Sequence, residues 1–347
     1  NSGPVCVGGS LQLTASGITG TTPFTYSWTG PNGFTSNVQN PVINPVTLLH
    51  AGDFILTISD ANGCSSEQLT TTVVVNALPT PTLTGEPSFC YGTTEVYTAG
   101  GGVNYTFTLY QGAVIVAGPV SGAGNTYTTS STLAAGTYTL NVLVVDANGC
   151  EAEADYPFTV YPTPAATIAF DPAVICEGGS SNLIITLTTG TPVWSAVFNN
   201  GTVDANTGNV AGTVYTLPVT ATSDLTYTLK SVSDANCSAT INATATLTVN
   251  EQPTVGVTSS NPPTNQVCVD GSITLTASGS GGSGNYVYRW SKGGVVLQEG
   301  TQDTYVITGA QLSDAGTYSV VVIDTEGGVS CESDPATIDV VVTQATA

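Results

Sequence analysis

Short stretches in which hydrophobic and polar residues alternate run through the whole chain. Residues 11–15, 54–58 and 318–322 are examples, and they are rich in β-branched and aromatic side chains. Alternation with a period of two is typical of β-strands that bury one face. Clusters of Gly, Asn, Asp and Pro bound these stretches, as expected for turns. No stretch with helical periodicity exceeds two turns, so the pattern predicts an all-β protein.

The chain contains four copies of one repeat. A leading cysteine opens a segment such as Cys-Val-Gly-Gly-Ser-Leu, and a trailing cysteine closes a segment such as Asp-Ala-Asn-Gly-Cys. The leading cysteines are Cys6, Cys90, Cys176 and Cys268, and the trailing cysteines are Cys64, Cys150, Cys237 and Cys331. Within a copy the two lie 58 to 63 residues apart. We expect four domains, at residues 1–78, 79–163, 164–253 and 254–347.

Roughly seven short strands in a repeat of about 90 residues indicate a β-sandwich. Pro-bearing joints such as residues 77–81 and 161–164 separate the repeats, and Pro stiffens a linker. These features predict a linear rod of sandwiches. Few residues precede Cys6, so we expect the first repeat to lack its first strand. Either the chain is a window from a longer array, or a neighbouring chain supplies that strand.

The fourth repeat resembles an immunoglobulin-like domain. Trp290 lies within a strand, and the segment Ser-Asp-Ala-Gly-Thr-Tyr that ends at Tyr318 precedes a Val-rich strand. These residues match the tryptophan of strand C and the tyrosine corner of strand F. The resemblance extends to all four repeats and implies tandem immunoglobulin-like sandwiches. The core aromatic residues that it implies are Trp28, Trp194, Trp290, Tyr138, Tyr227 and Tyr318.

The cysteines depart from the antibody-type pattern, in which a disulfide joins the centres of strands B and F. Ala277 and Val320 occupy those centres in the fourth repeat. We expect each leading cysteine to bond the trailing cysteine of its own repeat and to staple one end of that sandwich. Closing such a loop of about 60 residues is worth roughly 4 kcal/mol. Disulfides indicate an oxidising, extracellular location, and the sequence lacks the close Cys-x-x-Cys spacing of zinc sites.

The sequence motifs of the repeats also resemble those of immunoglobulin-like repeats in large Bacteroidota surface proteins. The shared segments include Cys-x-Gly-Gly-Ser, Tyr-Ser-Trp-Thr-Gly-Pro-Asn-Gly and Asp-Ala-Asn-Gly-Cys. Those proteins are typically exported by the type IX system and include gliding-motility adhesins. The resemblance implies a giant cell-surface adhesin whose partners are neighbouring immunoglobulin-like domains or subunits of the same fibre. It transfers no binding residue.

Acidic residues flank the last hairpin of the fourth repeat, namely Asp324, Glu326, Glu332 and Asp334. Carboxylates are ligands for Ca²⁺, and no basic residue is close to them in sequence. A calcium site and a solvated acidic face are both compatible with this cluster, and no other cofactor is expected. The Asp-Ala-Asn-Gly segments lack the alternating carboxylates of a calcium loop. They predict hairpin turns with Asn and Gly at positive φ.

No catalytic machinery is evident in the sequence. His50 is the single histidine, and no Gly-x-Ser-x-Gly nucleophile elbow accompanies it. We therefore expect no enzyme. Aromatic residues in loops, such as Phe34 and Tyr91, are candidates for stacking on surface glycans.

Composition excludes two classes of partner. The 347 residues include 3 Lys or Arg and 24 Asp or Glu, for a formal net charge of −21 at pH 7. Nucleic-acid phosphates are neutralised by Lys and Arg, so no nucleic-acid partner is expected. No apolar run reaches the roughly 18 residues of a membrane span, so no membrane insertion is expected. We expect a stalk or filament segment of an extracellular structural or adhesive protein. The alternative is an accessory module, carbohydrate-binding or spacer, of a secreted polysaccharide-degrading enzyme.

Overall fold

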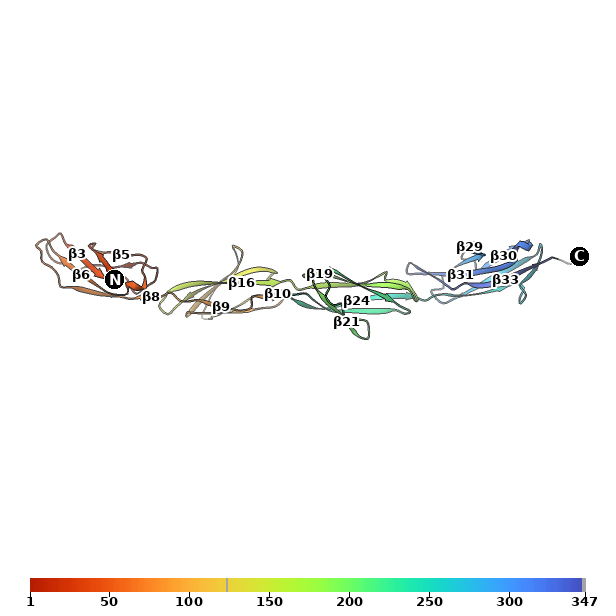
Figure 1. Cartoon of the computed structure of the whole chain (residues 1–347), viewed down its shortest axis with the longest axis horizontal. Coiled ribbons are helices and arrows are strands. Elements are labelled where there is room, and N and C mark those ends of the chain that lie inside the picture. Colours follow the sequence, from red (N-terminus) through yellow and green to blue (C-terminus); the bar gives the residue numbers. More distant parts are fainter. Residues whose placement is uncertain (123, 345–347) are drawn as a thin grey trace. The chain divides into compact units, whose positions relative to one another are not determined.

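The chain folds into β-sandwiches. The computed structural model describes residues 1–122 and 124–344, and it consists almost wholly of strands and turns. The chain divides into two compact units, residues 1–162 and residues 163–347. Each unit contains two sandwiches (Figure 1). Each sandwich has a hydrophobic core of its own. The expected all-β class is confirmed.

The second sandwich shows the complete topology. Its smaller sheet is antiparallel, in the order β9, β11, β14 (Thr82–Thr84, Val96–Gly100, Thr126–Thr128). Its larger sheet has the order β10, β16, β15, β12, β13 (Ser88–Cys90, Glu151–Tyr161, Gly136–Val145, Asn104–Gln111, Val114–Gly122). β10 is the exception to antiparallel pairing, because it runs parallel to the last strand, β16.

The third and fourth sandwiches repeat this plan. The sheets of the third are β17, β19, β22 (Ala165–Asp171, Ser180–Thr189, Val214–Thr220) and β18, β24, β23, β20, β21 (Val174–Cys176, Ser238–Asn250, Leu225–Ser233, Ser195–Asn199, Asp204–Asn206). The sheets of the fourth are β25, β27, β30 (Thr254–Ser259, Ser272–Ser280, Thr304–Thr308) and β26, β33, β31, β28, β29 (Gln266–Cys268, Ala336–Thr343, Gly316–Glu326, Tyr286–Lys292, Val295–Gly300), with β32 (Val329–Glu332) paired to β31.

The first sandwich is smaller. Its sheets are β2, β5 (Leu11–Gln12, Val42–Ile43), β4, β3, β6, β7 (Phe34–Ser36, Thr25–Gly30, Gly52–Ser59, Leu69–Val73) and the parallel pair β1, β8 (Val5–Cys6, Val75–Asn76). Three short 3-10 turns complete the secondary structure, η1 and η2 in this sandwich and η3 in the fourth (Pro31–Gly33, Leu48–His50, Leu312–Asp314). Within the described residues, no strand covers the edge of β2 at the place that β9 takes beside β11.

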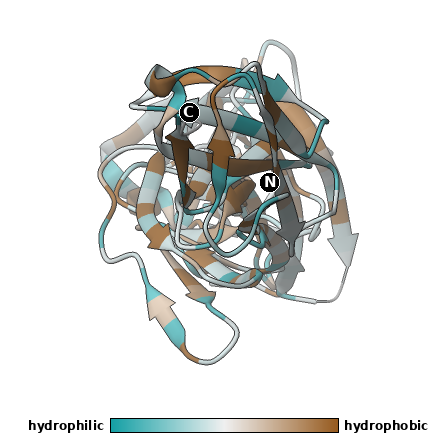
Figure 2. Cartoon of the chain, turned by 90° about the vertical axis from the view of Figure 1, so that its right-hand side faces the viewer, coloured by the Kyte–Doolittle hydropathy of each residue, from teal (hydrophilic) through white to brown (hydrophobic). Residues whose placement is uncertain are grey.

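Alternating side chains build each core. Along β15, the side chains of Tyr138, Leu140, Val142 and Val144 are buried, and the residues between them are partly exposed. Hydrophobic and hydrophilic bands follow one another along the strands in Figure 2. The aromatic residues expected in the cores are all buried, namely Trp28, Trp194, Trp290, Tyr138, Tyr227 and Tyr318.

A tyrosine near the start of the second-to-last long strand closes the core in two sandwiches. The Tyr138 hydroxyl donates to the Ala134 carbonyl at 2.9 Å, and the Tyr318 hydroxyl donates to the Asp314 carbonyl at 3.0 Å. Burial raises the pKa of Tyr318 to about 12. In the first sandwich Phe54 takes this position and is fully buried. The aromatic ring alone is therefore enough to fill the core at this position, because Phe54 has no hydroxyl. In the other two sandwiches the tyrosine hydroxyl adds a hydrogen bond to the preceding turn.

Gly85 follows β9 where the backbone approaches a fully buried ring. A Cβ at this residue would lie 2.4 Å from Cδ1 of Tyr97. The Tyr97 hydroxyl donates to the Glu86 carbonyl at 2.9 Å, so this ring is held in place and cannot move aside. Glycine is therefore required here by close approach.

We predict that Gly85→Ala lowers the free energy of unfolding by about 1–3 kcal/mol, because overpacking shifts the Tyr97 ring or the backbone. Gly122→Ala, at the end of β13, is the matched control, because nothing lies within 4 Å of the added Cβ. Thermal unfolding followed by near-ultraviolet circular dichroism compares the two. Equal midpoints for both variants would contradict the packing argument.

Candidate functional site

The four leading cysteines occupy one and the same backbone frame. Each ends a short strand that runs parallel to the last strand of its sandwich, and its register partner closes that last strand. The pairs are Cys6 with Asn76, Cys90 with Tyr161, Cys176 with Asn250 and Cys268 with Thr343. The residue after each cysteine donates its N–H to the carbonyl of that partner, at 2.8 to 2.9 Å. Each leading cysteine therefore lies at the end of the sandwich where the chain leaves it.

Three of the trailing cysteines close a turn that an aspartate organises. In the second sandwich, Oδ1 of Asp146 accepts the N–H groups of Asn148 and Cys150 at 2.8 and 2.9 Å. The same bonds recur from Asp60 and Asp234. The N–H of Cys150 is the main cause that lowers the pKa of Asp146 below its usual value. This turn lies at the opposite end of the sandwich, where the last strand begins.

The predicted hairpin turns at the Asp-Ala-Asn-Gly segments are present, with one correction. Gly63 and Gly149 have φ of +80° and +81°. Asn62 and Asn148 do not have positive φ, because each donates its N–H to the aspartate carboxylate from an ordinary turn conformation.

The predicted pairing of cysteines within each repeat is wrong. Cys6 bonds Cys150 of the next sandwich, with Cα atoms 5.7 Å apart, and Cys176 bonds Cys331, with Cα atoms 5.6 Å apart. Cys90 and Cys237 are also disulfide-bonded. Among the described residues, Cys64 and Cys268 are free and exposed.

Strand length explains the correction. In the second sandwich, Cys150 directly precedes β16 and Cys90 pairs with its last residue, Tyr161. The 11 residues of β16 at about 3.3 Å each separate the two positions by roughly 35 Å. A disulfide requires Cα atoms about 4.4–6.8 Å apart. A leading cysteine therefore cannot reach the trailing cysteine of its own sandwich, whereas Cys6 and Cys176 each meet the trailing cysteine of the sandwich that follows.

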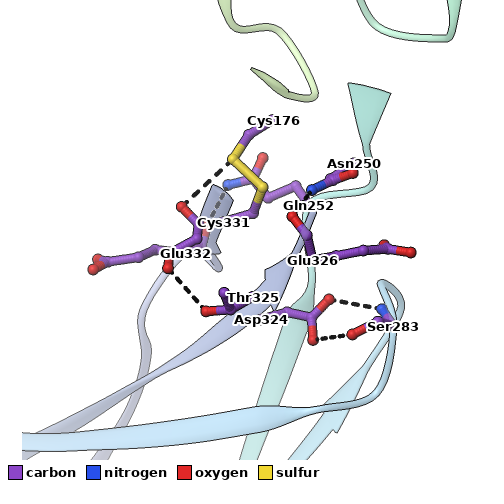
Figure 3. Close-up of a disulfide and its surroundings, with 10 residues drawn as sticks. Cys176, Asn250, Gln252, Ser283, Asp324, Thr325, Glu326, Cys331 and Glu332 are labelled. Carbon is purple, nitrogen blue, oxygen red and sulfur yellow. Dashed lines mark hydrogen bonds between the residues drawn. A yellow bond between two sulfur atoms is a disulfide. The ribbon is translucent and has the colours of Figure 1, made fainter. Parts of the chain in front are cut away.

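The junction around Cys176 and Cys331 contains further polar contacts (Figure 3). Nδ2 of the buried Asn250 donates to the Glu326 carbonyl at 2.8 Å. Nε2 of Gln252 donates to the Glu332 carbonyl at 2.9 Å. These bonds and the disulfide fasten the exit of the third sandwich to the last hairpin of the fourth.

The four carboxylates proposed for calcium are not gathered into a site. Asp324 is buried and accepts three hydrogen bonds, from N and Oγ of Ser283 and from N of Asn285. Glu332 pairs with Arg289 at 2.8 Å. Over residues 1–122 and 124–344, no group of three or more His, Cys, Asp or Glu is arranged to hold a metal. The neighbouring strand β28 supplies a basic residue that proximity in sequence did not reveal.

Two other candidate residues have structural surroundings. Phe34 packs edge-on against Phe54, with ring centroids 5.4 Å apart, and is partly buried. Nδ1 of His50 accepts the Thr47 N–H at 3.0 Å and so caps its own 3-10 turn. Tyr91 is exposed, as a glycan-stacking residue has to be.

A family model and a phage protein are each similar to part of this chain. A family model described as "Immunoglobulin domain" matches residues 253–340. A decoration protein of Escherichia phage T5 is 37% identical over 54 residues, which are 16% of this chain and 33% of that protein. This match thus spans about a third of the relative's length.

Solved structures also match this chain, at low sequence identity. Sidekick-1 immunoglobulin domains 1–5 are 13% identical, over 98% of this chain and 78% of that chain, with a TM-score of 0.33. Titin fragment I67–I69 is 14% identical, over 77% and 99%, with a TM-score of 0.39. A structure of a 1.5-MDa bacterial ice-binding adhesin is 14% identical, over 77% and 99%, with a TM-score of 0.33.

We predict that non-reducing peptide mapping recovers the links Cys6–Cys150 and Cys176–Cys331, with Cys64 and Cys268 alkylated beforehand as free thiols. Combined chymotrypsin and Glu-specific cleavage separates these cysteines, because the chain has no Lys or Arg before Lys230. A peptide that joined Cys6 to Cys64 would restore the pairing within repeats.

We also predict an acid-sensitive turn. Asp146 has a lowered pKa in the folded state, so its contribution to stability is present above the unfolded pKa of about 3.9 and is lost as pH falls through the lower, folded value. Asp146→Ala should unfold at a lower temperature than the wild type at neutral pH, and the difference should shrink toward about pH 2. A pH-independent difference in melting temperature would show that the carboxylate charge is not involved.

The topology of the four sandwiches and the family match to the fourth establish what these junctions connect: the protein is built from tandem immunoglobulin-like β-sandwich domains.

Proposed function

We propose that this chain is a load-bearing segment of an extracellular stalk or filament, without catalytic activity. The observation that carries the proposal is the pairing of two leading cysteines, Cys6 and Cys176, with a trailing cysteine of the following domain. A disulfide within a domain protects only that domain. A disulfide across a junction changes the covalent path along which tension passes.

Tension follows the shortest covalent path between the chain ends. The Cys6–Cys150 bond bypasses residues 7–149, and the Cys176–Cys331 bond bypasses residues 177–330. The remaining path runs through residues 1–6, 150–176 and 331–347. Most of each sandwich therefore lies outside the loaded path, and its unfolding cannot lengthen the chain.

The size of this effect is large. A fully extended residue spans at most about 3.6 Å, so the whole chain could reach roughly 1,200 Å. The path through the two bonds has about 50 residues and could reach roughly 180 Å. An array with this connectivity resists extension even when its domains open, as a stalk under shear requires.

The chemistry of the chain supports an extracellular setting. Disulfides persist in oxidising compartments, and six of the eight cysteines are disulfide-bonded. None of the helical turns in the described residues is long and apolar enough to cross a membrane. Part of the proposal is that the parent protein is a surface adhesin of the Bacteroidota type IX class. Domain boundaries near residues 78, 163 and 253, and glycans that bind exposed aromatic residues such as Tyr91, are further parts of it.

We predict a strong redox dependence in single-molecule pulling between the two chain ends. The oxidised protein should extend to no more than roughly 180 Å, and the protein in reducing buffer should unfold in steps toward roughly 1,200 Å. Cys176→Ser combined with Cys331→Ser is the matched control and should give an intermediate extension when oxidised. Full-length unfolding of the oxidised wild type would refute the load-bearing role.

A further inference from the structure

Cys268 is free, yet it lies in the same frame as cysteines that are bonded. It ends β26 opposite Thr343, just as Cys176 ends β18 opposite Asn250. The following turn is also alike: Gly271 donates its N–H to the Cys268 carbonyl at 2.9 Å, and Gly179 donates to that of Cys176 at 2.8 Å. The thiol of Cys268 is therefore positioned at the exit of the fourth domain as the thiol of Cys176 is at the exit of the third.

Cys64 has the complementary frame. It closes the turn of Asp60 as Cys150 closes the turn of Asp146, with carboxylate-to-amide distances of 3.0 and 2.9 Å. In both turns the aspartate N–H donates to the cysteine carbonyl at 2.9 Å. Cys150 is fully buried in its bond to Cys6, whereas Cys64 is exposed.

The described residues thus contain one free trailing cysteine, Cys64, and one free leading cysteine, Cys268. The first domain presents a trailing cysteine at its entrance, and the fourth presents a leading cysteine at its exit. We propose that Cys268 of one copy of this chain forms a disulfide with Cys64 of a second copy, so that copies join end to end through the same junction that links the domains inside each copy. This inference does not depend on the load-bearing role, because it rests on the equivalence of the frames.

The entrance of the first domain is also open as a docking surface. A cavity of about 340 Å³ lies beside Cys64, and its mixed lining includes the apolar residues Ile18, Phe24 and Leu69 and the polar residues Ser16, Asp60 and Ser66. The Leu69 side chain is 52% exposed. In the fourth domain β25 pairs along the corresponding edge of β27, whereas no strand of the described residues pairs with this edge of β2, where Ser2 hydrogen-bonds Gln12.

The bond forms by thiol–disulfide exchange with a small disulfide such as oxidised glutathione. The Cys268 thiolate attacks one sulfur of glutathione disulfide and releases one glutathione thiolate. The Cys64 thiolate of the second copy then attacks the Cys268 sulfur and releases the second. Each cysteine loses one proton and one electron, and two molecules of glutathione leave in the reduced form.

Charge sets the conditions for this encounter. Asp60 and Glu67 lie near one end, Asp270 and Asp314 lie near the other, and the first 229 residues contain no Lys or Arg. The two ends therefore repel each other weakly, and salt screens this repulsion. Linkage should be faster at about 0.5 M than at about 0.05 M salt, which distinguishes docking of these ends from attraction between opposite charges.

The test uses two full-length variants in a buffer of oxidised and reduced glutathione. Cys64→Ser leaves Cys268 free, and Cys268→Ser leaves Cys64 free. The mixture should form disulfide-linked dimer at least about tenfold faster than either variant alone, as non-reducing electrophoresis measures. Peptide mapping of the dimer should recover a Cys64–Cys268 link with Cys6–Cys150 intact, and the wild type should form longer multimers.

A displaced thiol is the matched control. The triple variant Cys64→Ser, Ser65→Cys, Cys268→Ser moves the exposed thiol by one residue. In extended chain, neighbouring side chains point to opposite sides, so the thiol then points away from its original direction. Mixed with Cys64→Ser, it should lose most of the rate advantage. Equal dimer yield from this control, equal yield from each variant alone, or absence of any linked dimer would each overturn the proposal. None of these outcomes bears on the pulling experiment within one copy.

Discussion

The length of the last strand in each sandwich is the constraint on which the covalent organisation depends. A strand of 11 residues such as β16 holds the entrance and the exit of its domain roughly 35 Å apart. A cysteine at either end can then bond only across a junction. The leading and trailing cysteines are held at opposite ends of each sandwich. The repeated cysteine motifs therefore produce disulfides between neighbouring domains and not within one domain.

Several parts of this arrangement were predictable from sequence. The alternation around Tyr318 specified a buried strand face because a period of two allows no other compact solution. The turns at Asp60 and Asp146 were recognisable because an aspartate followed by Asn-Gly organises its own backbone. The tryptophans were expected in the cores from the resemblance to immunoglobulin-like domains, and Trp28, Trp194 and Trp290 are buried.

The connectivity was not predictable. Separations of 58 to 63 residues within a repeat, and of 144 or 155 residues for the observed bonds, are both compatible with chain closure. Which cysteines bond each other depends on the end of the sandwich at which each one lies. That position is set by parallel strand pairing, such as Cys6 with Asn76, which no local sequence motif reveals. For the same reason, the sequence did not reveal that Arg289 pairs with Glu332 of the acidic cluster, because the two residues are 43 positions apart.

The two disulfide-closed loops affect what happens when a protease cuts the chain. A peptide bond hydrolysed anywhere in residues 7–149 leaves the two fragments attached through Cys6 and Cys150, and the same holds for residues 177–330 through Cys176 and Cys331. The protein is thus doubly connected over most of its length. A single nick by a protease within either loop creates a new pair of chain ends without parting the segment, because the disulfide that closes the loop keeps the two fragments joined.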